Sequence, residues 1–446
     1  MTFDNSSSAY RSWGGLEAGV TAVLHPRDPA TLRLPNSAWL AYGNGRSYGD
    51  SCFPESGILI DMRGMKRIMA FNPETGLIRS EAGLTLGDLI TNVSKAGWFP
   101  AVVPGTRHVT LGGALANDIH GKNHHRAGSF GDHVTAFELL RSDGSRTICT
   151  PDQNAGLFRA TIGGMGLTGL ISWIEMQLMR VSSPDLSQDI LPLENLDDFF
   201  RLAPASDASH AYSVAWIDSL ATGDKLGRGV LLRANHASSG ALAKGRGKPL
   251  FSVPFTPPFS LINALTLRAF NAAYRQRSLM QQGSRHVNHD SFFFPLDAVG
   301  HWNRLYGPAG LRQHQSVLPM AGAKAAVTAL IKATQKARHG SFLTVLKLFA
   351  DRPAAGMMSF PKAGATLTLD FPYHGQKTDR LLDQLDAITI AAQGRVNPYK
   401  DAHMSAATFA ASYPEADSFQ PFIDPLARSR FAVRVGLIKA SPDTIR

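Results

Sequence analysis

Residues 104–134, PGTRHVTLGGALANDIHGKNHHRAGSFGDHV, constrain the fold of this chain more than any other stretch. They include six glycines and five histidines, and no helix or strand of ordinary length fits across them. Chains use glycine where the backbone adopts a left-handed conformation or approaches another group closely. Successive N–H groups in such loops form anion-binding nests that suit a diphosphate. We therefore expect backbone laid against a large, flat ligand, although a single Gly-Gly pair would indicate only a surface loop.

Two further glycine-rich stretches have the same character. Tyr42–Ser51, YGNGRSYGDS, follows an apolar run, and Ile162–Gly169, IGGMGLTG, precedes the alternating residues 170–178. The first stretch lacks the third glycine of a nicotinamide fingerprint, and no downstream acidic residue closes a βαβ unit. The sequence has no GxxxxGK(S/T) motif, which argues against a P-loop nucleotide site.

Together the three stretches resemble the vanillyl-alcohol-oxidase-type flavoproteins, and among them most closely the decaprenylphosphoryl-β-D-ribose oxidases. The resemblance is carried by GNGRSYGD at 43–50, PGTRHVTLGGA at 104–114, DIHGKNHHRAGSFG at 118–131, GLTG at 166–169, WNRLYGPAG at 302–310 and KLF at 347–349. It spans nearly the whole chain and implies an α+β fold. The expected parts are a two-part FAD-binding domain over 1–180, a substrate domain with an antiparallel sheet and helices over 181–393, and a return segment over 394–446.

Length and composition agree with this organisation without selecting a function. A chain of 446 residues exceeds a typical single domain, so two domains are expected. Two cysteines, Cys52 and Cys149, provide neither a disulfide framework nor a thiolate metal cluster, which suits a reducing compartment. The sequence has no secretory h-region and no apolar run of 18 residues. We expect a cytoplasmic protein, with peripheral contact to the inner face of the plasma membrane as an option.

The net charge of +10 leaves several classes of partner open. Nucleic acid is one, but the basic residues are scattered and no nucleic-acid-binding motif accompanies them, so we expect no nucleic-acid partner. An anionic small substrate or an anionic membrane surface explains the charge at least as well.

Local patterns predict the elements of both parts. Apolar spacing predicts a helix over Thr85–Ala96 that ends at Gly97, and Asp143-Gly144 predicts a hairpin between strands at Val134–Leu140 and Thr147–Thr150. Beyond residue 181 we expect an antiparallel sheet with helices on one face. The expected helices are Leu191–Leu202, Ala323–Ala337 and Thr378–Ala392, and the expected strands are Ala211–Asp218, Gly229–Ala234, Val317–Pro319, Phe342–Phe349 and Thr366–Phe371.

The segment Lys244–Arg277 differs from its surroundings. It opens with basic residues, continues with four prolines among phenylalanines, and ends in an amphipathic pattern with two arginines. Long loops of this kind are often surface excursions that pack on their own domain. The same combination of apolar residues and cationic flanks also suits interfacial membrane contact, which a lipid-linked substrate favours.

The resemblance implies an FAD site built from the glycine stretches. Related oxidases often carry a histidine, bonded covalently to the flavin, where this chain has Arg46. Arginine does not readily form that bond, so noncovalent FAD is expected. The expected cofactor-binding residues are Gly43, Asn44, Gly45, Arg46, Ser47, Tyr48, Gly49, Gly105, Thr110, Leu111, Gly112, Gly113, Asn117, Asp118, Ile119, His120, Ile171 and Asn397.

Three residues are the candidates for catalysis. The resemblance places Lys400, in NPYKDA, over the flavin and against the substrate hydroxyl, either as a base with a lowered pKa or as a fixed cation. Tyr48 is the second candidate for the proton, and His120 belongs in or near the pocket. His120 and His124 have the spacing of a helical zinc pair, but Gly121 lies between them and no ligating carboxylate follows, so no metal is expected.

The same resemblance implies a sugar pocket lined by Trp302 as well as Trp216, Tyr306, Gln313, Gln315, Lys347, Phe349 and Lys400. Two departures from the family bear on the pocket shape. Asn397 stands where a tyrosine is usual, and Thr368 replaces a cysteine of mycobacterial members.

The implied reaction is oxidation of the 2-hydroxyl of a polyprenylphosphoryl-β-D-ribose-like, lipid-linked pentose to the 2-keto sugar. A separate NAD(P)H-dependent short-chain reductase would complete the epimerisation to arabinose for the cell envelope. Two alternatives remain. One is an oxidase of a soluble alditol or aldonolactone, and the other is a flavin-binding protein without turnover.

Overall fold

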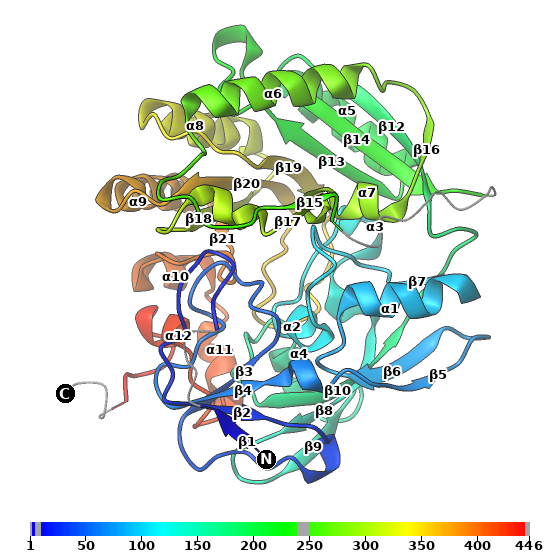
Figure 1. Ribbon diagram of the computed structural model, residues 1–446, viewed down its shortest axis with the longest axis vertical. Helices are drawn as coiled ribbons and strands as arrows, with labels where there is room; N and C mark the ends of the chain where they lie inside the picture. Colours follow the sequence, from blue (N-terminus) through cyan, green and yellow to red (C-terminus); the bar gives the residue numbers. More distant parts are fainter. Residues whose placement is uncertain (1, 5–9, 239–248, 442–446) are drawn as a thin grey trace.

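The computed structural model describes residues 2–4, 10–238 and 249–441. Figure 1 shows an eight-stranded sheet with its helices in the upper half and two smaller sheets below it. This arrangement confirms the predicted α+β class. The predicted boundaries at 180 and 393 fall after β11 (Met179–Arg180) and just beyond α9 (Gln376–Ala391).

The first small sheet carries the glycine loop that begins at Gly43. Its strand order is β1-β2-β4-β3, and both contacts of β4 are parallel. Parallel strands are covered on both faces and therefore read as continuous apolar runs, as in WLAY and ILID. The strands are β1 (Thr2–Asp4), β2 (Ala22–His25), β3 (Trp39–Tyr42) and β4 (Ile58–Asp61).

The second small sheet is antiparallel and supports the long glycine-rich stretch. Its order is β5-β6-β10-β8-β9, and the β8–β9 hairpin turns where Asp143-Gly144 predicts it. The strands are β5 (Ile68–Phe71), β6 (Leu77–Glu81), β8 (Val134–Leu140), β9 (Arg146–Cys149) and β10 (Leu170–Gln177), and β7 (Trp98–Phe99) pairs separately with β11.

Short helices connect these strands. In α1 (Leu86–Val93) the Thr85 side chain caps the first turn, and Gly97 ends the following 3-10 turn with φ +79°, as the sequence predicts. The long stretch itself forms only α2 (Leu111–Ala116) and α3 (His124–Ala127), which agrees with the absence of any long element across it. The remaining helix of this half is α4 (Ala155–Thr161).

The eight-stranded sheet forms the upper half and is antiparallel throughout its order β16-β12-β14-β13-β19-β20-β18-β21. Its strands are β12 (Leu186–Leu193), β13 (Tyr212–Ile217), β14 (Gly229–His236), β16 (Arg285–Val287), β18 (Leu311–Leu318), β19 (Thr344–Phe349), β20 (Gly364–Pro372) and β21 (Arg395–Val396). A two-stranded contact joins β15 (Phe251–Ser252) to β17 (Val299–Gly300).

Helices cover both faces of this sheet, which corrects the expectation of one covered face. In β13, Ala215 and Ile217 pack in the apolar core with α5 (Leu196–Ser209), α8 (Ala323–Lys336) and α9. Trp216 points the other way and meets Tyr274 of α6 (Ala264–Leu279), with ring centroids 4.7 Å apart. Successive side chains of a strand alternate between faces, so α6 lies on the opposite side. The last helix before β18 is α7 (His289–Phe293).

The helix predicted over Leu191–Leu202 is wrong at its start. Residues Leu186–Leu193 form β12, and α5 begins only at Leu196. Asn195 explains the late start, because its side chain accepts hydrogen bonds from the N–H groups of Asp197 and Asp198 and so caps the helix. The apolar residues before it pair with β14 instead.

The carboxy-terminal segment returns to the first small sheet. It contains α10 (Ala406–Ser412), α11 (Ala416–Phe419) and α12 (Arg430–Arg434). Arg434 of α12 pairs with both Asp50 (2.7 Å) and Asp401 (3.0 Å), which fastens the glycine loop to the returning chain. At Gly49 a Cβ would overlap the Asp401 carbonyl oxygen, so only glycine fits this close approach.

Candidate active site

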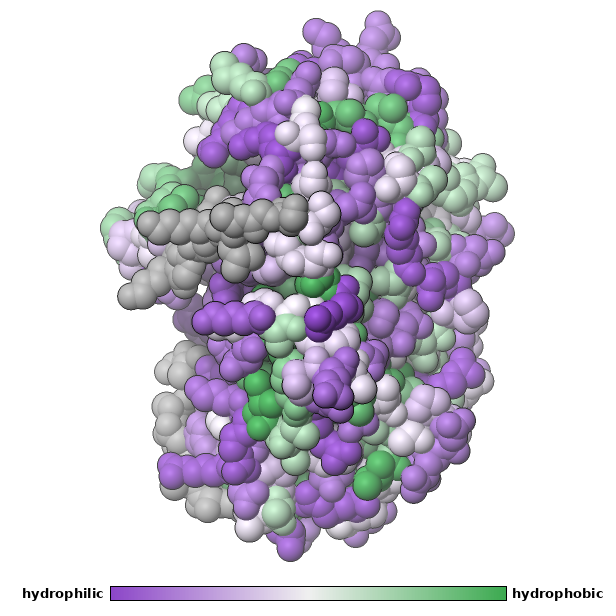
Figure 2. Space-filling model, turned by 90° about the vertical axis from the view of Figure 1, so that its right-hand side faces the viewer, coloured by the Kyte–Doolittle hydropathy of each residue, from purple (hydrophilic) through white to green (hydrophobic). Residues whose placement is uncertain are grey.

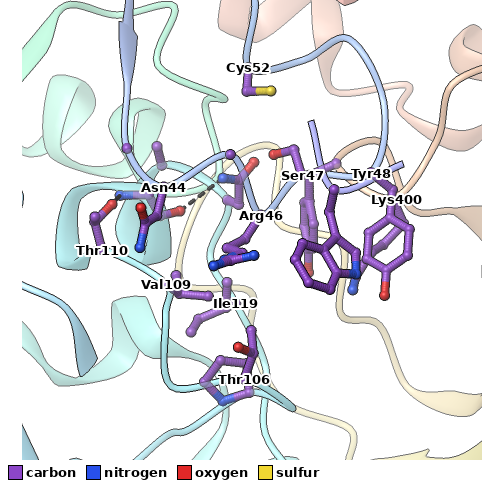
Figure 3. Close-up of a pocket in the computed structure, with 18 of the residues that line it drawn as sticks. Asn44, Arg46, Ser47, Tyr48, Cys52, Thr106, Val109, Thr110, Ile119 and Lys400 are labelled. Atoms are coloured by element: carbon purple, nitrogen blue, oxygen red, sulfur yellow. Dashed lines mark hydrogen bonds between the residues drawn. The ribbon is translucent and has the colours of Figure 1, made fainter. Parts of the chain in front are cut away.

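A cavity lies where the two glycine loops, residues 42–51 and 104–134, meet the eight-stranded sheet and the returning chain (Figure 3). Loop residues form its lower wall, and the sheet contributes side chains from β18, β19 and β20. Most predicted site residues line this cavity: Gly43, Asn44, Gly45, Arg46, Ser47, Tyr48, Gly105, Thr110, Gly112, Gly113, Asn117, Ile119, His120, Ile171, Gln313, Gln315, Lys347 and Lys400, together with Trp302.

Four of the predicted cofactor residues lie behind the cavity wall instead of on it. Gly49 packs on the returning chain, and Leu111, the first residue of α2, is buried in the apolar core. The Asp118 carboxylate accepts hydrogen bonds from the Gly131 N–H (2.8 Å) and the Ser359 hydroxyl (2.5 Å), and it therefore holds the loop in shape. Asn397 does not line the cavity itself but is hydrogen-bonded to residues that do, Gln315 and Tyr399.

Three of the predicted sugar-pocket residues also lie outside the lining. Trp216 packs on α6, as described above. The Phe349 ring lies behind His120, with centroids 4.9 Å apart. Tyr306 is buried in an apolar cluster with Tyr48 and Trp302, and its hydroxyl has no hydrogen-bond partner among the described residues. All three are large aromatic residues for which packing in the core competes with lining a pocket.

The two glycine loops are joined by direct contacts that shape the lower wall. The Asn44 amide of the first loop donates a hydrogen bond to the His108 carbonyl of the second (2.9 Å), and within the second loop the Thr110 hydroxyl accepts from the Gly113 N–H. Gly43 approaches the Thr110 side chain so closely that a Cβ would overlap it, whereas a Cβ on Gly105 would meet nothing within 4 Å. The loop at Gly105 thus leaves open space on the cavity side.

Arg46 supplies an unneutralised charge to this wall. Its guanidinium lies over the Trp13 ring at 4.5 Å, and in Figure 3 its side chain extends toward Val109 and Ile119. Its Nε is buried and has no partner among the described residues. Burial lowers the pKa of Arg46, and Asp297 opposes that effect. A buried cation with an open donor fits an electron-rich group such as a flavin or a phosphate, so the residues present suit FAD.

Hydrogen bonds fix the protonation of His120. The Tyr399 N–H donates to the Asn397 side-chain oxygen (3.2 Å), so the Asn397 amide N–H₂ donates to the Gln315 oxygen (2.9 Å). The Gln315 amide then donates to His120 Nε2 (3.1 Å), which must accept. His120 Nδ1 therefore carries the proton and faces the Tyr399 hydroxyl at 3.2 Å. Burial lowers the pKa of His120, and Lys347 and Lys400 add to the effect, so the ring is neutral.

Lys400 lines the cavity beside Tyr48. Its ammonium lies over the Tyr48 ring, 4.3 Å from the centroid. Burial lowers the pKa of Lys400 to about 8, and the charge of Asp370 opposes the shift. Burial raises the pKa of Tyr48 well above its usual value, so this hydroxyl stays protonated at neutral pH. Lys400, unlike Tyr48, is thus a group whose charge can change near physiological pH.

A second buried network adjoins Lys400 and was not predicted. The Gln313 amide donates to the Asp370 carboxylate, and the Asp370 N–H donates to the Ser341 hydroxyl (2.9 Å). The other Asp370 oxygen, the Gln313 oxygen and the Tyr306 hydroxyl are buried without a partner among the described residues. Burial raises the pKa of Asp370 to about 7, whereas the Gln313 hydrogen bond and the Lys400 charge lower it.

Two more lysines give this end of the site a positive field. The Lys347 ammonium donates to the Gly121 carbonyl (3.1 Å), and burial lowers its pKa to about 7, with smaller effects from Lys122 and Lys400. Lys122 bonds to the Phe292 carbonyl and lies over the Phe292 ring at 4.4 Å. Burial alone lowers its pKa to about 7. Lysines that repel one another in a buried site favour an anionic ligand.

Other lining residues were not predicted from the sequence. Trp13, Tyr42, Asp297 and Tyr399 belong to this group, and Thr368 was noted only as a departure from the family. Asp297 accepts from the Thr106 hydroxyl (2.9 Å) and the Arg107 N–H (2.8 Å), which joins the glycine-rich stretch to the upper half. Tyr399 adjoins Lys400 in NPYKDA, so the motif itself was a usable signal.

Comparisons with known proteins agree with this site. The FAD binding domain family matches residues 31–150, which include both loops of the lower wall. A decaprenylphosphoryl-beta-D-ribose oxidase of Mycolicibacterium smegmatis is 34% identical over 435 residues, 94% of this chain and 94% of the relative. An L-gulonolactone oxidase of Mus musculus is 28% identical over 45% of this chain and 46% of its own length.

These matches confirm FAD as the cofactor and the vanillyl-alcohol-oxidase-type α+β fold. The protein is an FAD-dependent oxidoreductase that acts on a sugar. Because the M. smegmatis relative exceeds 30% identity across nearly the full length of both chains, this chain belongs to the decaprenylphosphoryl-beta-D-ribose oxidase family.

Proposed function

We propose that this protein oxidises the 2-hydroxyl of a polyprenylphosphoryl-β-D-ribose-like, lipid-linked pentose to the 2-keto sugar. The family assignment supports the substrate class, and the M. smegmatis relative is named for that substrate. The observation that carries the chemistry is the half-buried Lys400, which lines the cavity beside Tyr48 in the same site as His120. This is the first half of an epimerisation of ribose to arabinose.

The two sides of the cavity have different tasks in this proposal. Bound FAD supplies the two-electron acceptor. His120 is neutral and both of its ring nitrogens have hydrogen-bond partners, so it shapes the pocket and does not take the substrate proton. Lys400 contacts the hydroxyl, either as a cation that holds negative charge on the oxygen or, once deprotonated, as the base. Its deprotonated fraction grows as pH rises through about 8.

The positive field around Lys122, Lys347 and Lys400 supports an anionic substrate. All three lysines are half-buried in or beside the cavity, and among the described residues none of them forms an ion pair, although the charge of Asp370 acts on Lys400. A phosphodiester next to the sugar would be attracted by this field, whereas a neutral polyol would gain nothing from it. The proposal therefore favours the phosphorylated substrate over a free sugar.

We further propose that the FAD is held noncovalently. Arg46 occupies the loop position at which related oxidases carry a bonding histidine, and its side chain extends into the cavity. Acid precipitation should leave the yellow colour in the supernatant. Colour that stays with the precipitated protein would contradict the proposal.

Completion of the epimerisation needs a second protein in this scheme. The 2-keto product must be reduced again, and the chain has no nicotinamide fingerprint, so a separate NAD(P)H-dependent short-chain reductase is the proposed partner. The protein alone with substrate and an electron acceptor should accumulate the keto sugar. Formation of the arabino product without a reductase would exclude this partner.

The central experiment is an anaerobic flavin-bleaching screen. Polyprenylphosphoryl ribose and other polyprenylphosphoryl pentoses are compared with free alditols and L-gulono-1,4-lactone, because the mouse lactone oxidase is also a relative. Bleaching by the phosphorylated ribose alone supports the proposal. Bleaching by free polyols or the lactone would favour a soluble-substrate oxidase, and no bleaching with any sugar would favour a flavin-binding protein without turnover.

A further inference from the structure

A second cavity lies beside the ends of the inner strands β13 and β20 of the eight-stranded sheet, away from the site described above. Its walls come from the turn after β13, the start of α6, the end of α8 and the connection between β20 and α9. An apolar cluster that includes Ile262, Leu267 and Trp302 separates it from the first cavity. Five basic residues line it, and no aspartate or glutamate does: Arg268, Arg338, His339, His374 and Lys377.

The arginines and the lysine of this group are not neutralised by any residue that the structure describes. Among the described residues, Arg268, Arg338 and Lys377 form no ion pair, and all three side chains belong to exposed residues. By contrast, Arg275, which lies two turns after Arg268 on α6, pairs with Glu194 at 2.7 Å. Three unpaired cations around one concave space attract an anion more strongly than the same charges spread over a surface.

The two histidines lie side by side in the wall of the same cavity. The rings of His339 and His374 stack with centroids 5.2 Å apart. The Thr378 hydroxyl donates to the Pro372 carbonyl (3.3 Å), so His339 Nε2 must donate to that hydroxyl (2.9 Å). Burial, with smaller effects from His374 and Lys377, lowers the pKa of His339 to about 4. No acidic group offsets these effects, so the cavity is electropositive even with neutral histidines.

We propose that this cavity binds the phosphate group of an anionic lipid headgroup. Phosphate is the natural partner of clustered arginine and lysine donors that have no internal acceptor. The position of the cavity favours a lipid over a soluble phosphate compound, because α6, which carries Arg268, begins next to exposed apolar residues. Phe259 is 65% exposed, Leu261 is 38% exposed, and Leu265 in the first turn of α6 is 76% exposed. An apolar surface that enters the acyl region would bring the cavity to headgroup level.

The anion site itself rests on the basic residues of the cavity. Only the choice of a lipid over a soluble phosphate compound depends on contact of the exposed apolar residues with a membrane. The test uses the full-length FAD-loaded protein with two probes. The soluble probe is glycerol 1-phosphate, followed by calorimetry, and the lipid probe is a vesicle of phosphatidylcholine with phosphatidylglycerol, followed by flotation. The variants are Arg268→Ala, Arg338→Ala and Lys377→Ala.

Each cavity variant should weaken binding about fivefold, the effect of removing one cation next to a phosphate surface. Matched controls are Lys332→Ala and Lys336→Ala, both on α8, the helix that precedes Arg338. Both are exposed basic residues outside the cavity lining, and they should change binding less than twofold.

Weaker binding of both probes in the cavity variants alone supports a lipid headgroup site. Weaker binding of glycerol phosphate with unchanged flotation keeps the phosphate site and assigns it to a soluble phosphate compound. Equal effects of cavity and control variants on both probes would overturn the proposal. Flavin bleaching by substrate should be unchanged in all five variants, so failure of the oxidation proposal and failure of this one give different results.

Discussion

At the scale of single residues, substitution of Lys400 distinguishes a role in the reaction from a purely structural role. Lys400→Ala should retain FAD but slow flavin reduction by roughly 10²–10⁴-fold, the usual value of a positioned proton-transfer group. Lys400→Arg keeps a charge but does not act as a base. If arginine restores most of the rate, Lys400 is a fixed cation; if it does not, proton transfer is needed. Anaerobic stopped-flow reduction at saturating substrate measures this, and an unchanged rate in the alanine variant would remove Lys400 from the reaction.

Asp370 predicts a specific pH dependence for the same step. Its charge raises the pKa of Lys400, which burial lowers to about 8. In Asp370→Asn that support is lost, so the pKa of Lys400 should fall. If Lys400 acts as the base, the rate rises with pH as the amine loses its proton, and the midpoint of this rise should move to lower pH in the variant.

The other titratable groups around Asp370 do not produce this shift. Tyr48 and Tyr306 have raised pKa values and stay neutral, and Lys347, with a pKa of about 7, is present in both proteins. Asparagine still accepts the Gln313 hydrogen bond, so the fold is retained. Flavin reduction rates between pH 6 and 9 provide the comparison. A pH profile that keeps its midpoint would show that Asp370 does not act on the reacting group.

Residues of the cavity wall could be predicted where a sequence motif carried them. Arg46, His120 and Lys400 stand in distinctive motifs, and all three line the cavity. Asp370 was missed because a lone carboxylate at the end of an apolar strand resembles an ordinary strand end. Its role appears only when β20 is placed beside β18, a pairing that no local pattern encodes. The tautomer of His120 likewise depends on contacts between distant segments.

At the scale of elements, the docking of the return segment depends on Gly49. A side chain there would overlap the Asp401 carbonyl and push apart the two segments that carry Tyr48 and Lys400. Gly49→Ala should destabilise the protein by about 1–3 kcal/mol, the usual effect of overpacking, and should weaken FAD retention. Thermal unfolding and the ratio of flavin to protein measure both effects.

Gly322→Ala is the matched control for this substitution. A Cβ at Gly322 meets nothing within 4 Å, and its φ of −133° is open to any residue. Because Gly322 is the N-cap of α8, where alanine is less favourable than glycine, the control should lose about 0.5–1 kcal/mol and should keep its FAD. If Gly49→Ala behaves like the control, the return segment does not dock as tightly as the contacts between Gly49 and Asp401 require.

Elements were predictable where local signals and tertiary contacts agree. The spacing of Thr85–Ala96 and the turn at Asp143-Gly144 have local causes, and α1 and the β8–β9 hairpin follow them. The apolar residues of 191–193 fit a helix equally well on spacing alone. Pairing with β14 assigns them to a strand, and this pairing joins residues some forty positions apart. Face assignment failed for the same reason, because only the packing of Trp216 on Tyr274 places α6.

At the scale of the whole molecule, apolar exposure is concentrated in one region. Eight of the eleven exposed large apolar side chains among the described residues lie between 250 and 280, within or next to the segment predicted to contact a membrane. By contrast, the face in Figure 2 is mainly hydrophilic, with apolar side chains in small separate groups. No helix in the described part of the chain has the length and hydropathy to cross a bilayer.

We propose that this region inserts its aromatic side chains into an anionic membrane surface. Phe255 and Phe259 are 68% and 65% exposed, and the chain carries a net charge of +10. Residues 239–248, which include the basic start of the predicted segment, lie outside the described residues. A peripheral protein of this kind would meet a lipid-linked substrate at the surface where the substrate resides.

The double variant Phe255→Ser, Phe259→Ser tests this contact. Burying a phenylalanine is worth about 1.5–3 kcal/mol, so the loss of two should reduce vesicle binding by more than tenfold. FAD content should not change, because neither residue lines the cavity.

Met69→Ser is the matched control: Met69 is also an exposed apolar residue, 48% exposed, but it lies on β5 in the other half of the molecule. Vesicle flotation at low and high salt separates apolar insertion from charge attraction, since only the latter weakens with salt. Equal flotation of the double variant and the control would show that Phe255 and Phe259 do not insert into the membrane.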